Sequence, residues 1–436
     1  MKRWGSPGVR RAAAVLAVVL AGSGAQLHRS QHVHVPLLSS AVVLGAGGER
    51  VPLGAGDITL VVPGTRVLAL PELTTTAAGQ ALWLRSGRVP GAGDRYADMT
   101  STALLDLHTL TLPGGAAIAG WPQSWRYVWP RDASFTAVAL ARTGHRDDAV
   151  AVLQYLQRMQ APDGALQARY LPDGSGRPPD GRGEQTDGLG WVLWASQQVV
   201  LTAPVSERAS LAGSLRPLVT RSLARILTLT SGRTVLPPPS PDYWEVRDAR
   251  LSLGTVAPLA LGLRSAPALL ALLGLPDADA VARAAALERA MHQAFSPGGY
   301  PRYLDDAAPD ASLAFLLPPF APGCKPEVLD AWRRAREAMR RPAGGLAPGA
   351  GWKNDGISWT PETALFALTA AATGDRAAAE QYLTWLDRHR TNHGALPEKV
   401  LSNGDPAGPA PLGWTAALVV LTVDALEHQS DTGCAG

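Results

Sequence analysis

The helical part of the chain, beginning at about residue 97, alternates between two kinds of segment. One kind is amphipathic and charged, and five of its six members are His145–Gln160, Ser206–Thr230, Asp277–Phe295, Lys325–Arg341 and Asp375–Arg390. The other is apolar nearly all round: Phe135–Ala141, Gly188–Leu201, Leu251–Leu263, Glu362–Ala372 and Leu412–Leu426, with Ser312–Phe320 as a shorter and poorer case. A helix that is apolar on every side must be buried, whereas a helix with a polar face lies at the surface. Six buried helices alternating with six surface helices predict an all-α fold, an (α/α)6 barrel over residues 95–428.

Two further regions precede the predicted barrel. Short Val-rich runs separated by Gly and Pro between residues 33 and 70 predict three or four strands, within a short β-rich segment over residues 33–92. Residues 1–25 combine a basic start with an uncharged run from Ala12 to Ala21 and small residues near Ala25, which is typical of a signal peptide. The apolar run is too short for a comfortable membrane span. We therefore expect a secreted protein, with an uncleaved membrane anchor as the alternative.

The amino-acid composition excludes several classes of protein for this chain. With 436 residues, 46% hydrophobic and 18% charged, the chain can bury a large core and is neither disordered nor a coiled coil. Removing the signal peptide takes away four basic residues and no acids, so the formal charge falls from +3 to −1 and a nucleic-acid partner has no support. The two cysteines, Cys324 and Cys434, could pair in an exported chain, but this question stays open. No CxxC or His/Cys cluster occurs, so we expect neither a metal nor another cofactor.

The barrel topology predicts where the chemistry lies. All inner helices run in one direction, so their N-termini, with free N–H groups and positive dipole ends, gather at one end of the barrel. Charged residues and tryptophans precede these helices, in the segments 125–132, 183–188, 241–247, 351–359 and 394–399. Flat apolar platforms with a few polar groups are typical of a carbohydrate pocket. Taken singly, Asp132 and Asp187 could instead be helix N-caps.

Two glutamates in these segments fit glycoside hydrolysis, which needs a pair of carboxyl groups flanking the scissile bond. Glu245 follows Trp244, whose apolar ring would favour the protonated form, so Glu245 is the candidate general acid. Glu398 is the candidate general base. A separation of roughly 6.5–9.5 Å between the carboxyl groups would imply inversion, and about 5 Å would imply retention.

Four ordered segments resemble glycoside hydrolase family 15, which includes glucoamylases, glucodextranases and bacterial trehalases. They are Tyr127-Val-Trp129-Pro-Arg131-Asp132, Gln185-Thr-Asp187-Gly188, Tyr243-Trp244-Glu245-Val-Arg247 and Gly394-Ala-Leu-Pro397-Glu398. The resemblance covers about residues 95–428. It implies an inverting hydrolase without a redox cofactor, in which Arg131 and Asp132 hold hydroxyls of the terminal glucose. The full set of candidate substrate-binding residues is Tyr127, Trp129, Arg131, Asp132, Asp187, Trp244, Arg247 and Trp359.

The chain also departs from the family pattern. Val246 stands where glucoamylases often carry a second Glu, and the segment 352–355 lacks the Arg and Tyr usually found before the tenth helix. The β-sandwich that commonly precedes the barrel in bacterial members is reduced to a short stretch. These departures leave the catalytic pair intact and put the glucoamylase label in doubt.

Three hypotheses follow. The first is an exo-acting α-glucoside hydrolase releasing glucose from an α-glucan, an isomalto-oligosaccharide or a trehalose-type substrate. The second is a non-catalytic sugar-binding protein on a decayed hydrolase barrel. The third is a polysaccharide lyase, which is disfavoured because lyases need Tyr or His and basic charge in the cleft. His393 is the imidazole near these segments. Linkage preference and oligomeric state are left open.

Overall fold

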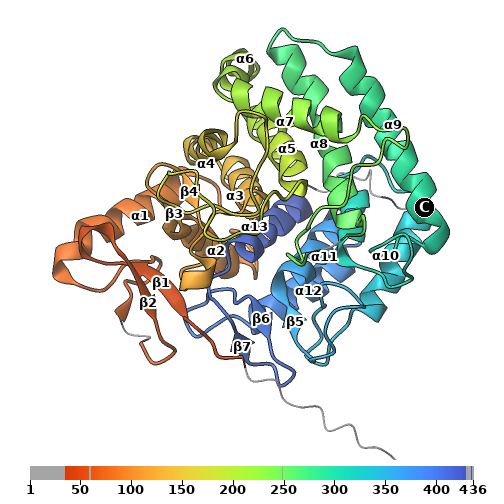
Figure 1. Ribbon diagram of the computed structural model, residues 1–436. Helices are drawn as coiled ribbons and strands as arrows, with labels where there is room; N and C mark the ends of the chain where they lie inside the picture. The colour runs from red at the N-terminus through yellow and green to blue at the C-terminus, as the bar shows by residue number, and fades with distance from the viewer. Residues whose placement is uncertain (1–34, 58–59, 248, 429–433, 435–436) are drawn as a thin grey trace, which may run out of the picture. The chain divides into compact units, whose positions relative to one another are not determined.

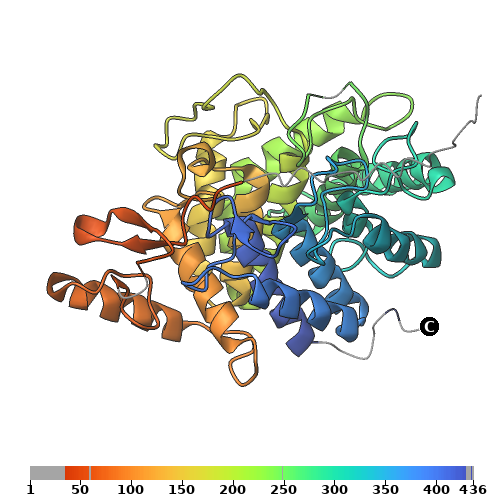
Figure 2. The ribbon, with the colours of Figure 1, turned by 90° about the horizontal axis from the view of Figure 1, so that it is seen from below.

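The computed structural model describes residues 35–57, 60–247, 249–428 and 434, so the predicted signal peptide lies outside the described residues. The inner segments of the barrel are α3 (Pro130–Arg142), α5 (Asp187–Thr202), α8 (Leu253–Leu272), η6 (Ala311–Leu316), α11 (Thr360–Thr373) and α13 (Gly413–Glu427). Each packs against the next, and α13 returns beside α3 to close the ring (Figures 1 and 2). The predicted (α/α)6 barrel is therefore confirmed.

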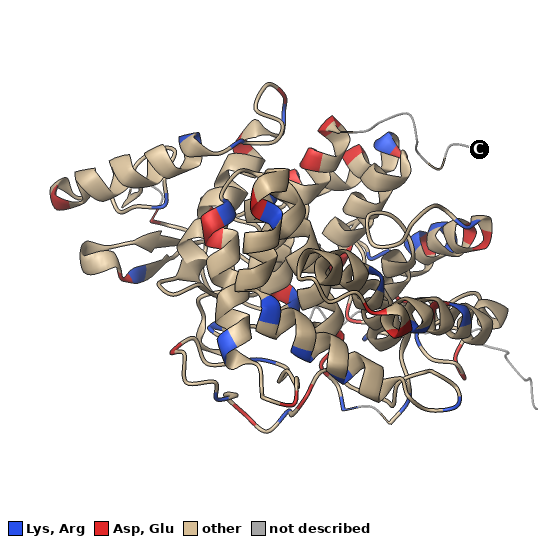
Figure 3. Cartoon of the chain, turned by 90° about the horizontal axis from the view of Figure 1, so that it is seen from above, with Lys and Arg blue, Asp and Glu red and all other residues tan. Residues whose placement is uncertain are grey.

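An outer helix precedes each inner segment in the chain. The outer helices are α2 (Ala97–Leu110), α4 (Arg146–Met159), α7 (Arg216–Leu229), α9 (Ala278–Phe295), α10 (Pro326–Ala338) and α12 (Arg376–Arg388). Their buried residues lie on one face, as in α4 at Ala149, Val152, Leu153 and Leu156. Acidic and basic residues are interspersed along the described chain, and much of the ribbon is uncharged (Figure 3).

The predictions for two helical segments were wrong in detail, and proline residues explain both differences. The single helix predicted over Ser206–Thr230 is two, α6 (Val205–Ser214) and α7, because Pro217 in the first turn of α7 has no N–H to continue the preceding helix. The segment Ser312–Phe320 does not form an α-helix. It is replaced by the 3-10 helix η6, which ends before Pro318 and Pro319.

Aromatic rings fill the centre of the barrel. Phe135 on α3 contacts Trp191 and Trp194 on α5 and Trp414 on α13, with ring centroids 5.0–5.9 Å apart. Phe320, after η6, lies 5.9 Å from the same ring. Trp191 and Trp194 are therefore core residues rather than sugar platforms. Because the centre is packed, a cavity at one end of the barrel cannot continue through it.

Helices α5 and α8 approach closely at glycines. A Cβ atom at Gly190 would collide with the carbonyl group of Pro258, and one at Gly262 would lie 2.7 Å from the Cα of Gly190. Helix α8 is also long and apolar enough to cross a membrane, with 72% of its most apolar window buried inside the barrel. Its place in the inner ring accounts for that composition.

The N-terminal region differs from its prediction. Where three or four strands were expected over residues 33–92, the described residues contain β1 (Ala41–Leu44) paired antiparallel with β2 (Arg50–Leu53), isolated bridges, and a helix, α1 (Thr74–Ser86), that was not predicted. Helix α1 has few buried side chains, Ala77 and Gln80 among them, so its amphipathic pattern is weak. The proposed boundary between this region and the barrel stays a prediction.

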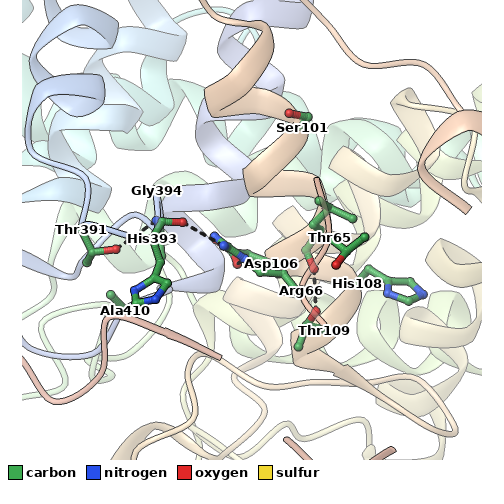
Figure 4. Close-up of polar contacts among 12 residues, drawn as sticks. Thr65, Arg66, Ser101, Asp106, His108, Thr109, Thr391, His393, Gly394 and Ala410 are labelled. Carbon is green, nitrogen blue, oxygen red and sulfur yellow. Dashed lines mark hydrogen bonds and ion pairs between the residues drawn. The ribbon is translucent and has the colours of Figure 1, made fainter. Parts of the chain in front are cut away.

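Buried polar contacts join this N-terminal region to the barrel, as Figure 4 shows. Arg66 Nε and Nη2 donate to the two carboxylate oxygens of Asp106 on α2 at 2.5 and 3.1 Å, and Arg66 Nη1 donates to the carbonyl of His393 at 2.8 Å. The Thr391 hydroxyl donates to the carbonyl of Ser40 at 2.6 Å. The region thus supports the loop that leads to Glu398.

Small antiparallel sheets connect the loops at the end of the barrel. Strand β5 (Ser358–Trp359) pairs with β6 (Lys399–Val400), which pairs with β7 (Pro406–Ala407). In this register Trp359 lies opposite Lys399. The loops before α11 and α13 are therefore held side by side. A second hairpin is formed by β3 (Thr111–Leu112) and β4 (Ala116–Ala117).

Cys324 and Cys434 form a disulfide, which answers the question that the sequence left open. The bond closes a loop with a sequence separation of 110. A disulfide that closes so long a loop removes much conformational entropy from the unfolded chain. Replacing both cysteines by Ser should therefore lower the free energy of unfolding by about 2–5 kcal/mol. Thermal unfolding of wild type and the double variant, with and without reductant, measures this. Equal melting temperatures under all four conditions would contradict it.

Candidate active site

A cavity of about 350 Å³ lies where the inner helices begin. Its walls come from the loops before α3, α8, α11 and α13, from the loop between α4 and α5, and from the first turns of α3, α11 and α13. The lining residues are Ala119, Ser124, Trp125, Trp129, Arg131, Asp132, Arg169, Arg182, Tyr243, Trp244, Glu245, Pro348, Trp352, Trp359, Pro361, Glu362, Glu398, Lys399, Leu412 and Trp414. Four of the five segments predicted to converge therefore contribute to one pocket, whereas the segment 183–188 supplies none of its lining residues.

Seven of the ten predicted site residues line this cavity, the proposed acid and base among them. They are Trp129, Arg131, Asp132, Trp244, Glu245, Trp359 and Glu398. Burial raises the pKa of the Asp132 carboxyl, and the guanidinium of Arg131, 2.9 Å away, opposes that shift. A carboxyl and a guanidinium side by side offer both acceptors and donors to sugar hydroxyls.

Three predicted residues do not line the cavity. Tyr127 packs against Arg169, whose guanidinium lies 4.8 Å from the ring centre, so Tyr127 contacts a residue of the wall without lining the cavity itself. Asp187 is buried at the first position of α5, where its carboxylate accepts from Trp191 Nε1 at 3.3 Å, and burial raises its pKa to about 6. Arg247 is exposed. Direct sugar contact by these three residues stays an untested prediction.

Glu398 is held by contacts to both of its carboxylate oxygens. Trp125 Nε1 donates to Oε1 at 2.9 Å, and Lys399 Nζ lies 2.7 Å from Oε2. The backbone N–H of Glu398 donates to the carbonyl of Pro409 at 2.9 Å, and its carbonyl accepts from Thr360 at 3.0 Å. A carboxylate held by a hydrogen bond at one oxygen and an ion pair at the other, and facing a cavity, is suited to accept a proton from water.

Glu245 stands in a tight turn. Its N–H donates to the carbonyl of Asp242 at 2.8 Å, and the N–H of Trp244 donates to the Asp242 carboxylate at 2.9 Å. The turn gives Glu245 a φ of 55°, a left-handed conformation that is uncommon for residues other than Gly and is associated with functional sites. Its side chain is ion-paired with Arg182, from the loop between α4 and α5.

A buried network supports this turn. Arg302 Nη2 donates to Asp242 at 2.6 Å, and its Nη1 lies 3.3 Å from Asp310. The Tyr243 hydroxyl donates to the same Asp310 carboxylate at 2.5 Å. The guanidinium of Arg302 stacks on the Trp244 ring at 3.8 Å. The network therefore fixes the three residues that precede Glu245 in the turn.

Many polar atoms at the cavity wall have no hydrogen-bond partner in the part of the chain that the structure describes. They are the indole N–H groups of Trp129, Trp244, Trp352, Trp359 and Trp414, with Arg131 Nε and Nη1, Arg169 Nε and Glu362 Oε2. Buried polar groups are nearly always hydrogen-bonded, because leaving them unpaired costs free energy. A polyhydroxylated ligand could satisfy many of them.

Sequence reasoning missed several wall residues. Trp125 and Lys399 lie inside two of the segments that were predicted to converge, 125–132 and 394–399. Their nearness to Trp129 and Glu398 in the sequence could have indicated them. Arg182 lies in an irregular loop with no helical or strand pattern, and nothing local indicates its contact with Glu245. Glu362 was counted as the start of an apolar inner helix. An acid within the first turn of a buried apolar helix was the signal there.

One group of metal-capable side chains occurs among the described residues: Asp424, Glu427 and His428. They lie at the C-terminal end of α13, away from the cavity, which adjoins its N-terminal end. Arg88 forms ion pairs with both acids, and Arg142 pairs with Asp424 at 2.9 Å. Arginine already neutralises this acidic cluster.

Comparisons with known proteins agree with this geometry. An isomaltose glucohydrolase of Kribbella flavida is 26% identical over 300 residues, covering 63% of this chain and 74% of that protein. An uncharacterized glycosyl hydrolase of Methanocaldococcus jannaschii is 32% identical over 99 residues, covering 22% and 16%. No protein-family model matches the chain.

Solved structures show the same fold. A glycosidase solved in complex with glucose superposes with a TM-score of 0.62 at 22% identity, over 76% of this chain and 96% of that chain. A bacterial glucoamylase complexed with acarbose superposes with a TM-score of 0.65 at 17% identity, over 80% and 58%. The resemblance to glycoside hydrolase family 15 is confirmed.

Proposed function

We propose that this chain is an inverting, exo-acting α-glucoside hydrolase that releases glucose, with Glu245 as general acid and Glu398 as general base. The observation that carries the proposal is the joint placement of these two glutamates. They come from segments far apart in the sequence and line one cavity, whose wall also carries several buried polar atoms with no hydrogen-bond partner among the described residues. Two carboxyl groups facing a sugar-sized pocket are the requirement for glycoside hydrolysis.

The closed end of the cavity supports exo action. Arg131, Asp132, Glu362 and Trp414 come from the first turns of inner helices, and the packed aromatic core lies beyond them. A polysaccharide chain cannot thread through such a pocket, so only a terminal sugar enters. The indole rings offer apolar platforms, and the polar atoms of Arg131 and Asp132 face the hydroxyls.

The two carboxyl groups divide the chemistry. Glu245 transfers its proton to the glycosidic oxygen as the bond from that oxygen to the anomeric carbon breaks. Glu398 takes a proton from a water whose oxygen bonds to the anomeric carbon from the opposite face, which inverts the configuration. Glu245 is paired with Arg182 without substrate, so the proposal requires this pair to separate when the leaving sugar unit binds.

The shape of the cavity and the similarity to a known hydrolase together suggest the substrate class. A blind pocket suits short oligosaccharides or chain ends, and a 26% identical relative is an isomaltose glucohydrolase. We therefore place isomaltose and related α-1,6-linked glucosides first among the substrates, ahead of maltodextrins and trehalose.

NMR of the products tests the function. The mature protein is incubated with isomaltose, panose, dextran, maltose and trehalose, and the anomeric signal of the first glucose released is recorded. We expect β-glucose to appear before mutarotation, with isomaltose cleaved fastest. α-Glucose appearing first would overturn inversion. Binding of these sugars without cleavage by the wild type would favour the sugar-binding alternative.

Secretion is a further part of the proposal. The signal-like residues 1–25 support export, and so does the disulfide between Cys324 and Cys434, because disulfides persist mainly in oxidising compartments. N-terminal sequencing of the protein from the culture medium would test this, with cleavage expected near Ala25. Recovery of the uncleaved chain in membranes would instead support an anchor.

A further inference from the structure

Glu362 is the least expected residue of the cavity wall. It lies in the first turn of α11, a helix whose other buried residues are apolar or small, and it is 3% exposed. Its Oε2 atom has no hydrogen-bond partner within the described residues. An acid in the first turn of a helix is usually explained by the helix dipole, but such an acid is normally exposed. A purely structural buried carboxyl would be expected to bond within the protein.

Charged groups surround this carboxyl on several sides. Arg131 and Asp132 face the same cavity from α3, Glu398 and Lys399 from the segment at β6, and Asp310 precedes η6. Burial raises the pKa of Glu362 to about 8; its own backbone N–H and Arg131 oppose this shift, whereas Glu398 and Asp310 add to it. The side chain is therefore neutral at about pH 7 and presents an O–H donor.

We propose that the buried carboxyl group of Glu362 donates a hydrogen bond to one hydroxyl of the terminal sugar and thereby positions that sugar between Glu245 and Glu398. The proposal rests on the proposed function, since it concerns the same site. It makes Glu362 a specificity-determining residue. A sugar that lacks the partner hydroxyl would leave a buried donor unpaired, and that is penalised more strongly than a lost surface contact.

The proposal sets the pH dependence of sugar binding. Below about pH 8 the carboxyl keeps its proton and the hydrogen bond is present. As the pH rises through about 8, Glu362 ionises, loses its O–H donor and becomes an anion near Glu398. KM should therefore rise on the alkaline side, because ionised Glu362 binds the sugar more weakly.

Two variants test this against a structural role. Glu362→Leu should raise KM about tenfold at about pH 6, because it removes the donor. Glu362→Gln keeps an N–H donor that does not titrate, so KM should rise only about threefold and stay level through about pH 9. Melting temperatures confirm that both variants fold. An unchanged KM in the Leu variant, or a wild-type alkaline rise in the Gln variant, would overturn the proposal.

Deoxy sugars identify the partner hydroxyl and keep the test independent of hydrolysis. Binding of glucose and its 2-, 3-, 4- and 6-deoxy derivatives is followed by tryptophan fluorescence. We expect one derivative to bind about tenfold more weakly than glucose to wild type, yet equally to Glu362→Leu. If the wild type cleaves no glucoside, the proposed function fails while this binding series still decides the role of Glu362. Equal losses for every derivative in both proteins would overturn that role.

Discussion

Replacing Glu398 by Gln is expected to lower kcat by about 10²–10⁴-fold, because a neutral amide cannot accept the proton of the attacking water. The change preserves shape, and Trp125 Nε1 can still donate to the amide oxygen, so the fold and sugar binding should survive. Steady-state kinetics on isomaltose, with the melting temperature of each variant, measure the effect. Glu380→Gln, in an exposed ion pair with Arg95, is the matched control and should keep wild-type kcat.

The nature of the leaving group separates the two catalytic roles. Glu245→Gln should lose a similar factor on isomaltose, whose leaving alkoxide needs a proton. It should recover much of that activity on glucosyl fluoride, whose leaving group needs little protonation. Glu398→Gln should recover far less, since the attacking water still needs a base. Equal recovery of both variants would contradict the assigned roles.

Replacing Arg302 by Met is expected to lower the free energy of unfolding by about 3–5 kcal/mol, since removing one partner of a buried ion pair leaves uncompensated charge. Here the carboxylates of Asp242 and Asp310 would both remain buried without their cation. Activity should fall as well, because Asp242 holds the turn of Glu245 and Arg302 stacks on Trp244.

Urea unfolding and kinetics on the same samples test this prediction. Arg333→Met is the matched control, because Arg333 pairs with Asp330 at the surface and exposed pairs contribute about 0–1 kcal/mol. An Arg302 variant as stable as the control would mean that the buried acids take up protons at no cost. If the Arg302 variant had normal stability and low activity, the network would serve to position Glu245 and would not stabilise the fold.

The architecture was predictable because helix burial follows from local pattern. Helices α5, α8, α11 and α13 are apolar on every side, and that property alone requires an inner ring. The split at Leu215 and the short η6 were missed, because hydrophobic periodicity outweighed nearby prolines in the prediction. Helix α1 was missed because it buries few side chains.

The sequence by itself also determined most of the site, since Trp129, Arg131, Asp132, Trp244, Glu245, Trp359 and Glu398 all precede or begin inner helices, and the topology brings these positions together. Only the tertiary structure decided that Asp187 is buried beside Trp191, that Arg182 pairs with Glu245, and that Glu362 faces the cavity. The local pattern of hydrophobic and polar positions predicts how deeply a residue is buried. The direction of a side chain and its partner depend on how distant segments pack, as in the β5–β6 pairing that places Trp359 opposite Lys399.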